Sequence, residues 1–370
     1  MTRLLSTLIL LASLPTAHAQ DPSALANRLK GGDGKASLEL ARLGEKAVPA
    51  LIGVLKDGDV KARGHAAYAL GIIGPAAKDA ADELARAMQD EDPGLTSQAA
   101  FALGKLGPAG GPAALKVLEK GDAKSAVHAA RALATMRAPV KGASAPLLAA
   151  LKKETTPQNQ TAFIDALASQ GPSAAEAVPY LVELAQNGKT PPVHVVVALG
   201  KIGSGAAGAV LYLTELLKKK EPGPITLHAV QALGQIGVRT PEIASALLDL
   251  MKEGSQPRMV LLESLSKAGG VTKETLPALS QGMRDKDHTV RLYSAQLVGS
   301  VDPNDLSVVS VLIESLQHKD AKVRKLAAEV LLTVQPRDEA VLEALQATAR
   351  DMDAGVRKAA EAALAKFKKK

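Results

Sequence analysis

Apolar residues along this chain recur with the spacing of one face of a helix. In residues 59–73 they fall on one face of a helix with 3.6 residues per turn, at Ala62, Ala66, Ala67, Leu70 and Ile73. Residues 78–88, KDAADELARAM, repeat that spacing. Gly74-Pro75 stands between the two runs and predicts the end of the first helix, because proline cannot continue a helix. No segment alternates strictly between apolar and polar residues, so we predict helices and no half-buried strands.

This helix pair is one unit of an internal repeat. The phrases HAAYALGIIG, QAAFALGKLG, HVVVALGKIG and HAVQALGQIG each end in a glycine that follows the first helix of a unit. Aligning the leucine of the A-L-G phrase gives a column of eleven anchor positions at a nearly constant interval. The anchors are Leu40, Leu70, Leu103, Leu133, Leu167, Leu199, Leu233, Leu265, Val298, Leu331 and Leu364. The column predicts eleven two-helix units.

A single helix pair cannot bury its apolar face, whereas stacked pairs share a continuous core. We therefore predict an all-α protein, an α-solenoid of about eleven two-helix repeats. The composition agrees with this fold, because 46% of the residues are hydrophobic and only 2% are aromatic. The core is expected to consist of small aliphatic side chains that let short helices pack closely.

The repeat resembles a known family. The motif Asp-x-x-Val-Arg, followed by the anchor phrase, stands at residues 287–291, 320–324 and 353–357. With that phrase, the chain resembles the HEAT-repeat family, in particular the short HEAT-like repeats of the phycobilisome-lyase type, over about residues 35–368. The resemblance implies a helical binding scaffold and specifies no chemistry.

The first residues, MTRLLSTLILLASLPTAHAQ, are typical of a secretory signal peptide, with Arg3, an apolar run and an A-x-A cleavage site. We expect cleavage after Ala19; the alternative is an uncleaved helix at the membrane interface. The predicted organisation is a signal peptide at 1–19, an N-terminal flank or capping segment at 20–34, and the solenoid at 35–370 with a short basic tail. No later segment is expected to insert stably into a membrane, so we predict an exported protein, periplasmic or extracellular.

An acidic column lies eleven residues before the anchors, at Asp59, Asp92, Asp122, Asp287, Asp320 and Asp353. Four of these are the second member of a D-x-D pair that begins at Asp57, Asp90, Asp285 or Asp351. We interpret the column as helix N-caps, whose side-chain oxygens accept hydrogen bonds from unpaired backbone N–H groups. The alternatives are calcium ligation and a carboxylate pair for acid–base chemistry.

Arginines recur seven residues before the anchors, at Arg63, Arg258, Arg291, Arg324 and Arg357. In the family that the chain resembles, this arginine ties one repeat to the next through the aspartate, which suits its planar, bidentate guanidinium. A phosphate-binding ridge is the alternative.

Four histidines lie five residues before the anchors, at His65, His128, His194 and His228. A row of imidazoles is able to bind a transition metal, but only the last two lie in adjacent units and no His-Glu dipeptide occurs. We interpret them as structural residues at the boundary between units, so no metal site is predicted.

No catalytic or cofactor-binding residue is predicted, and we expect a protein that is not an enzyme. There is no cysteine, which excludes disulfides and thiolate chemistry. Gly203, Gly205 and Gly208 match G-x-G-x-x-G, but the predicted helix before them excludes the strand that a dinucleotide site requires. Ser264 to Lys267 reads S-x-x-K without the accompanying motifs of serine acyl-enzymes.

The predicted function is an exported scaffold that binds a protein or peptide in a groove lined by the second helices of the units. The candidate contact residues are Tyr180, Glu183, Tyr212, Glu215, Glu314 and Gln317. One alternative is an anionic polymer or surface bound by basic residues at the ends of the second helices, such as Lys56, Lys120 and Lys218. Another is an accessory protein of a phycobilisome-lyase-like enzyme. Nucleic acid is not expected as a partner, because the chain has no tryptophan for stacking and carries an export signal.

Overall fold

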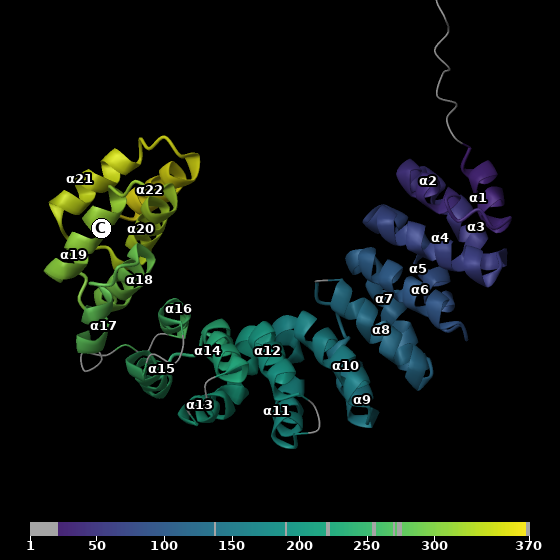
Figure 1. Ribbon diagram of the computed structural model, residues 1–370, viewed down its shortest axis with the longest axis horizontal. Coiled ribbons are helices and arrows are strands. Elements are labelled where there is room, and N and C mark those ends of the chain that lie inside the picture. Colours follow the sequence, from purple (N-terminus) through teal and green to yellow (C-terminus); the bar gives the residue numbers. More distant parts are fainter. Residues whose placement is uncertain are drawn as a thin grey trace, which may run out of the picture. The chain divides into compact units, whose positions relative to one another are not determined.

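A computed structural model describes residues 21–136, 138–188, 191–219, 223–253, 257–268, 271 and 276–367 (Figure 1). Over these ranges the chain forms α-helices, short 3-10 helices and turns, with no strand. The predicted all-α repeat fold is confirmed. The signal peptide at 1–19 and the last three lysines of the basic tail lie outside the described residues.

The chain divides into two compact units, residues 1–140 and 141–370. The division falls in the sequence RAPVKGASAP, one of the least repeat-like stretches of the chain. Unit 1 contains α1 Pro22–Lys30, α2 Ala36–Leu43, η1 Gly44–Ala47, α3 Val48–Asp57, α4 Val60–Ile73, η2 Gly74–Ala80, α5 Ala81–Ala87, α6 Pro93–Lys105, η3 Gly107–Gly110, α7 Gly111–Lys120 and α8 Ala123–Thr135. The predicted flank at 20–34 therefore contains a helix, α1, which packs on α2 and α3.

Unit 2 continues the alternation of helices. It contains α9 Ser144–Lys153, α10 Pro157–Ser169, η4 Gly171–Ala177, α11 Val178–Gln186, α12 Pro192–Ile202, η5 Gly203–Ala209, α13 Val210–Lys218, α14 Pro224–Ile236, α15 Pro241–Glu253, α16 Arg258–Ala268, α17 Leu276–Gly282, α18 His288–Gly299, α19 Leu306–Leu316, α20 Ala321–Val334, α21 Glu339–Thr348 and α22 Ala354–Phe367.

The even-numbered helices α2 to α22 carry the eleven anchors and are called the A-L-G helices. The odd-numbered helices α3 to α21 are the second helices of the sequence analysis. Ten anchors are buried, and the eleventh, Leu364, is half-buried because α22 is the last helix of the chain that the structure describes. The anchor column therefore marks the core.

The glycine of the A-L-G phrase lets neighbouring A-L-G helices approach closely. A Cβ on Gly104 of α6 would lie 2.7 Å from the Cβ of Thr135 and 2.9 Å from the carbonyl oxygen of Ala132, both on α8. A Cβ on Gly234 of α14 would lie 2.9 Å from the Cα of Ser264 on α16. Such distances leave no room for a methyl group, so this glycine is a packing requirement.

The glycine that ends the phrase has a different role, as the sequence predicts. Gly74, Gly107, Gly203 and Gly237 have φ of 69°, 66°, 67° and 71°, in the region that favours glycine. Each ends its A-L-G helix. Gly203 is therefore a helix stop, and the helix α12 precedes the G-x-G-x-x-G sequence where a dinucleotide fold requires a strand.

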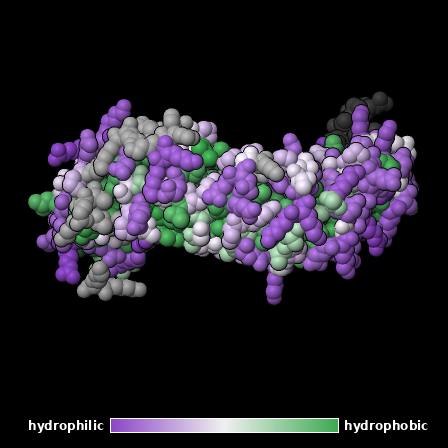
Figure 2. Space-filling view, turned by 90° about the horizontal axis from the view of Figure 1, so that it is seen from below, coloured by the Kyte–Doolittle hydropathy of each residue, from purple (hydrophilic) through white to green (hydrophobic). Residues whose placement is uncertain are grey.

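In unit 2 the second helices α9, α11 and α13 follow the outer edge of the curve, and α10, α12 and α14 follow its inner edge (Figure 1). The close approaches at the A-L-G glycines explain this curvature, because helices spaced more closely on one side bend the stack toward that side. Figure 2, a view from below, shows polar side chains over much of the surface with hydrophobic patches between them.

One described stretch, Pro192–Lys218, has the length and apolar composition of a membrane span. It is not one continuous α-helix: it consists of α12 and α13 joined by η5, with the break at Gly203. Its side chains contribute the buried anchor Leu199 and the buried Leu213 to the repeat core. The pattern is thus accounted for by two core helices.

Candidate functional site

All six residues of the acidic column cap helices. The Oδ1 atom of Asp59 accepts a hydrogen bond from the backbone N–H of Ala62 at 2.7 Å, and Asp92 accepts one from Leu95 at 2.7 Å. The caps at Asp122, Asp287, Asp320 and Asp353 accept from the backbone two or three residues on, at 2.7 to 3.0 Å. The predicted capping role is confirmed, since each carboxylate satisfies a backbone donor at the start of an A-L-G helix.

The first aspartate of each D-x-D pair forms a salt bridge with a basic residue that precedes it by about one repeat. Arg63 lies 2.9 Å from Asp90, Arg258 lies 3.1 Å from Asp285, and Arg324 lies 2.6 Å from Asp351. Lys30 takes the same place toward Asp57, at 2.8 Å. The separation along the sequence is the same in all four pairs, and we call each pair a rung. Three of the five arginines in the column, Arg63, Arg258 and Arg324, thus link repeat to repeat as predicted, whereas Arg357 donates to the carbonyl oxygens of Asp351 and Met352 in the turn before its own helix.

The rung aspartate also supports the cap that follows it. The Oδ1 atoms of Asp90, Asp285 and Asp351 accept the backbone N–H two residues on, at 2.9 to 3.1 Å. At Asp351 the guanidinium of Arg324 is the largest influence that lowers the carboxyl pKa, and this backbone hydrogen bond acts in the same direction. The two members of D-x-D therefore have different roles: the first binds arginine and the second caps the helix.

One rung is missing its carboxylate. The same separation counted from Arg291 reaches His318, not an aspartate. His318 still accepts the backbone N–H of Asp320 through Nδ1, at 3.1 Å, so it keeps half of the aspartate's role. Arg291 bonds instead to Glu314 at 2.9 Å and to the imidazole of His288, while its Nε is buried with no partner among the described residues. The sequence analysis did not detect this substitution.

Two histidines of the column, His194 and His228, contact neighbouring side chains of the repeat, as expected for structural residues. His194 on α12 lies 3.3 Å from the carboxylate of Asp165 on α10, which places it at the boundary between units as predicted. His228 bonds to Gln231 at 3.0 Å, and His65 is exposed. His128 is buried, and burial lowers its imidazole pKa, with Arg131 and Lys124 acting in the same direction. Among the described residues, no three His, Asp or Glu side chains gather as metal ligands would.

The six predicted contact residues lie on second helices or at their ends. Tyr180 and Glu183 are on α11, Tyr212 and Glu215 on α13, and Glu314 and Gln317 at the end of α19. The four polar residues are exposed and the two tyrosines are half-buried. The helices α11 and α13 follow the outer edge of the curve of unit 2 (Figure 1), and the groove along the second helices stays a prediction. Glu314 is also engaged by Arg291, so it has a structural role.

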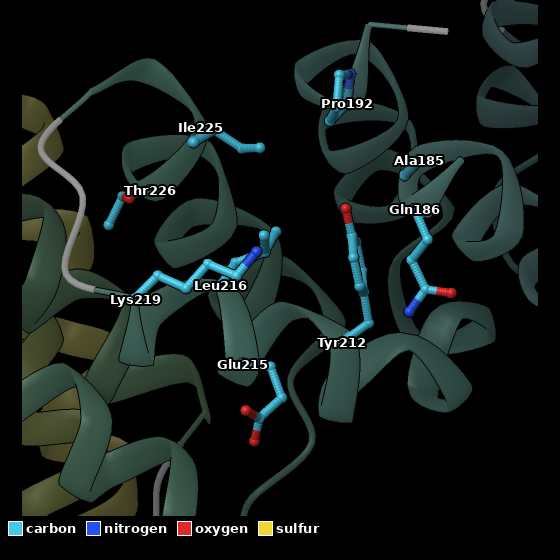
Figure 3. Close-up of a pocket in the computed structure, with 9 residues that line it drawn as sticks. All are labelled: Ala185, Gln186, Pro192, Tyr212, Glu215, Leu216, Lys219, Ile225 and Thr226. Atoms are coloured by element: carbon cyan, nitrogen blue, oxygen red, sulfur yellow. The ribbon is translucent and has the colours of Figure 1, made fainter. Parts of the chain in front are cut away.

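A pocket of about 370 Å³ opens beside α13 and contains two of the predicted residues (Figure 3). Tyr212 forms one wall with its hydroxyl pointing toward Pro192, and Glu215 and Lys219 lie at the rim (Figure 3). Burial raises the pKa of the Tyr212 hydroxyl, so the phenol is a neutral hydrogen-bonding group. The lining consists of Ala185, Gln186, Pro192, Tyr212, Glu215, Leu216, Lys219, Ile225 and Thr226.

Basic residues at the ends of the second helices are partly neutralised. Lys56 lies 3.5 Å from Glu83, and Lys218 lies 2.7 Å from Glu215. Lys120 is exposed. These surface pairs reduce the attraction that the ends exert on an anionic partner.

Two aromatic residues on unit 1 form a surface feature that the sequence analysis missed. Tyr68 on α4 and Phe101 on α6 stack with their ring centroids 6.3 Å apart, and both are exposed. A second pocket of about 450 Å³ adjoins Tyr68 between the same two helices. The two aromatics stand two positions before the anchors of adjacent units, and this shared offset is the signal that would have identified the stack.

A family model for HEAT repeats matches residues 33–104, 48–125 and 276–365. The chain therefore contains HEAT repeats in both units; the model describes HEAT repeats in general and does not single out the phycobilisome-lyase type. No curated protein matches the chain.

Similar solved structures include other large helical proteins. One comes from work on the phosphorylation switch that controls the interaction between cadherin and β-catenin, with 12% identity, a TM-score of 0.43, and coverage of 93% of this chain and 100% of that chain. Another is the karyopherin Kap121p bound to the extreme C-terminus of the phosphatase Cdc14p, with 13% identity, a TM-score of 0.45, and coverage of 94% of this chain and 45% of that chain. This chain thus spans less than half of Kap121p, and at these values the likenesses carry no argument about partners.

Proposed function

We propose that this HEAT-repeat protein is an exported, non-catalytic scaffold that binds a protein or peptide partner through the face lined by its second helices. The observation that supports the proposal most is the pocket beside Tyr212 (Figure 3). It combines an apolar wall of Ala185, Leu216 and Ile225 with polar groups at its rim. That combination suits an anchoring side chain of a partner, because apolar burial supplies affinity and a few polar groups fix orientation.

Residues of the preceding second helices would extend the proposed contact surface beyond the pocket. Tyr180 and Glu183 lie on α11, the second helix that precedes α13, and Lys152 of α9 stands over the Tyr180 ring at 5.5 Å. The tyrosines supply rigid contact area with a polar tip, and the glutamates supply charge that selects the partner. A protein or peptide lying across α9, α11 and α13 would contact all of these groups.

Affinity capture from the exported fraction tests this proposal, with the mature chain as bait. We expect a reproducible partner for the wild-type chain that is lost with Tyr212→Ala and kept with Tyr293→Ala, a tyrosine on the A-L-G helix α18. Equal capture by the two variants would contradict the assigned face.

Mass spectrometry of the exported chain tests the proposed secretion. The expected N-terminus is Gln20, left by cleavage after Ala19. An exported chain that still begins at Met1 would contradict cleavage.

A further inference from the structure

The A-L-G helices of unit 1 carry a surface whose composition is unlike the rest of the repeat. One stripe of side chains runs along each of the helices α4, α6 and α8. It consists of the residues that stand nine, five and two positions before the anchor and two positions after it. Because the positions recur in register, the stripes form a grid across three helices, which we call the unit 1 grid. Its members are Lys61, His65, Tyr68 and Ile72 on α4, Gly94, Gln98, Phe101 and Lys105 on α6, and Lys124, His128, Arg131 and Thr135 on α8.

From this grid we infer that unit 1 binds an extended, acidic segment of a partner protein in which carboxylates alternate with apolar side chains. The surface differs from the second-helix face of the proposed function, so each proposal stands or fails separately. The inference rests on charge sorting, on the aromatic stack, on the groove beside it and on a buried unpartnered histidine.

Charge is sorted between the helices α4, α6 and α8 and the helices α5 and α7 that alternate with them. The helices α4, α6 and α8 contain no aspartate or glutamate, whereas α5 carries Asp82 and Glu83 and α7 carries Glu119. Within the described part of the chain, Lys61, Lys105 and Arg131 are exposed and have no carboxylate partner. The carboxylates nearest to these helices are their N-caps Asp59, Asp92 and Asp122, so the exposed cations along the helices remain available to attract a negatively charged ligand.

Apolar groups stand between these cations. Ile72 is 47% exposed, Tyr68 39% and Phe101 37%, although the whole chain has only seven aromatic residues. The ammonium of Lys105 lies over the Phe101 ring at 5.3 Å, which holds a cation beside the stacked rings. Arg131 on α8 stands two residues before its anchor, the position that Tyr68 occupies on α4 and Phe101 on α6. Exposed apolar groups that gather in this way mark a contact surface.

The groove between α4 and α6 gives a bound chain room. It has a volume of about 450 Å³ and is lined in part by Gly64 and Gly94, which have no side chains to fill it. A Cβ on Gly64 would meet no atom within 4 Å. The lining includes one carboxylate, Asp92, whose Oδ1 already accepts the N–H of Leu95 at 2.7 Å. An incoming carboxylate would therefore find Lys61 and His65 in the lining, while Asp92 is engaged in capping α6.

His128 is a buried polar residue with a ring nitrogen that lacks a hydrogen-bond partner among the described residues. The residue is 8% exposed, and its Nδ1 has no hydrogen-bond partner among the described residues. Lys124 and Arg131 stand on the same stripe, four residues before it and three after it. Burial is the largest influence that lowers the pKa of the imidazole, both cations lower it further, and Asp122 opposes them. A carboxylate bound beside them would oppose that effect and raise the pKa of His128.

The spacing of the charges favours a peptide over a polyanion. Three helices packed 8 to 10 Å apart span about 20 Å, which an extended chain covers in about six residues. The grid offers Lys61, Lys105, Lys124 and Arg131 over that distance, separated by apolar groups. A nucleic acid or sulfated glycan presents a denser row of charges and needs a denser row of cations. Tyr68 and Phe101 stand two residues before their anchors, and the same position in the first three units of unit 2 is occupied by Asp165, Val197 and Gln231. These residues are not aromatic, so the aromatic part of the surface is confined to unit 1.

The test uses a fluorescein-labelled peptide of about ten residues in which Glu alternates with Leu and Phe, titrated into the mature chain. We expect binding that weakens with salt and falls about tenfold or more in the double variant Lys105→Glu/Arg131→Glu. The control Lys116→Glu/Lys120→Glu makes the same change of net charge on the second helix α7 and should leave affinity within about twofold. Circular dichroism verifies that both variants remain folded.

Three outcomes would overturn the inference. They are equal loss in both double variants, equal binding of a peptide with Gln in place of Glu, and tighter binding of heparin or single-stranded DNA than of the acidic peptide. NMR titration of His128 gives an independent readout, since the bound peptide should raise its pKa. An unchanged His128 pKa in the saturated complex would place the peptide elsewhere.

Discussion

Arg324 and Asp351 are joined by two hydrogen bonds, from Nε to Oδ2 at 2.6 Å and from Nη2 to Oδ1 at 2.9 Å. The same guanidinium donates to the carbonyl oxygens of His318 and Lys319 at 2.7 and 3.0 Å. One side chain thus links the turn before α20 to the turn before α22. The relation is the best-formed rung of the repeat, because a planar guanidinium is matched to a carboxylate in bidentate geometry.

Replacing Arg324 by lysine keeps the charge but removes the bidentate geometry. We expect Arg324→Lys to lower the free energy of unfolding by about 1 kcal/mol, since both partners are largely buried and a lysine makes fewer of these bonds. Urea denaturation measures the change, and hydrogen exchange should locate it in α20 and α22. The control Lys325→Ala breaks an exposed pair with Glu329 at 3.6 Å and should cost less than about 0.5 kcal/mol. If the two variants lowered the free energy of unfolding equally, the bidentate rung would contribute no more to stability than an exposed ion pair.

The missing rung at His318 can be restored. We expect His318→Asp to raise the stability of unit 2 by about 0.5 to 1 kcal/mol, because Arg291 gains a carboxylate at the rung position. The matched control is His318→Asn, which can still accept the backbone N–H of Asp320 but brings no charge. If asparagine stabilises as much as aspartate, the charge at this position is irrelevant.

The same site predicts a dependence on pH. The rings of His288 and His318 lie 4.0 Å apart, centroid to centroid. Burial lowers the pKa of His288 below 6.5, and Arg291 and His318 act in the same direction, while Glu314 and Asp287 oppose them. The folded state therefore favours neutral His288, so this contribution to stability is complete above about pH 6.5 and is lost as pH falls below it.

Thermal unfolding at pH 7.5 and pH 5.5 measures that contribution. We expect the wild-type midpoint to fall more between these pH values than the midpoint of His288→Gln, because the variant lacks the titrating group. His228→Gln, at a histidine that bonds to Gln231, is the control and should keep the wild-type dependence. The same pH dependence in His288→Gln as in the wild type would contradict the assignment.

Two glycines of unit 1 should respond oppositely to a methyl group. Gly104→Ala would place a Cβ 2.7 Å from Thr135 and 2.9 Å from the Ala132 carbonyl, so we expect a loss of about 1 to 3 kcal/mol. Gly64→Ala meets no atom within 4 Å and lies inside α4, so a gain of about 0.5 to 1 kcal/mol is expected from helix propensity. Urea denaturation of both variants tests the pair, and a neutral Gly104→Ala would contradict the close packing.

Much of the fold was predictable because its determinants are local or regularly spaced. The caps at Asp59 and Asp353 follow from a carboxylate before an apolar helix, and the stop at Gly203 follows from its place after the A-L-G phrase. Arg63 was identified as a member of the arginine column and Asp90 as the first member of a D-x-D pair, and their contact requires only that consecutive units stack in register.

What the sequence did not reveal depends on packing between helices. The curvature of unit 2 follows from how closely Gly200 and Gly234 let their helices approach, and the sequence alone does not indicate that the helix of Tyr212 lies on the outer edge of that curve (Figure 1). The stack of Tyr68 on Phe101 and the substitution of His318 for a rung aspartate appear only when residues of adjacent units are compared at fixed offsets.

The central claim is that a protein partner contacts the second-helix face beside Tyr212. Its most direct test is a photo-crosslinking amino acid placed at position 212 of the full chain in the cells that produce it, with position 293 as the control. We expect a single partner to be crosslinked from position 212 and none from position 293. Crosslinking of the same partner from position 293 with none from position 212 would contradict it.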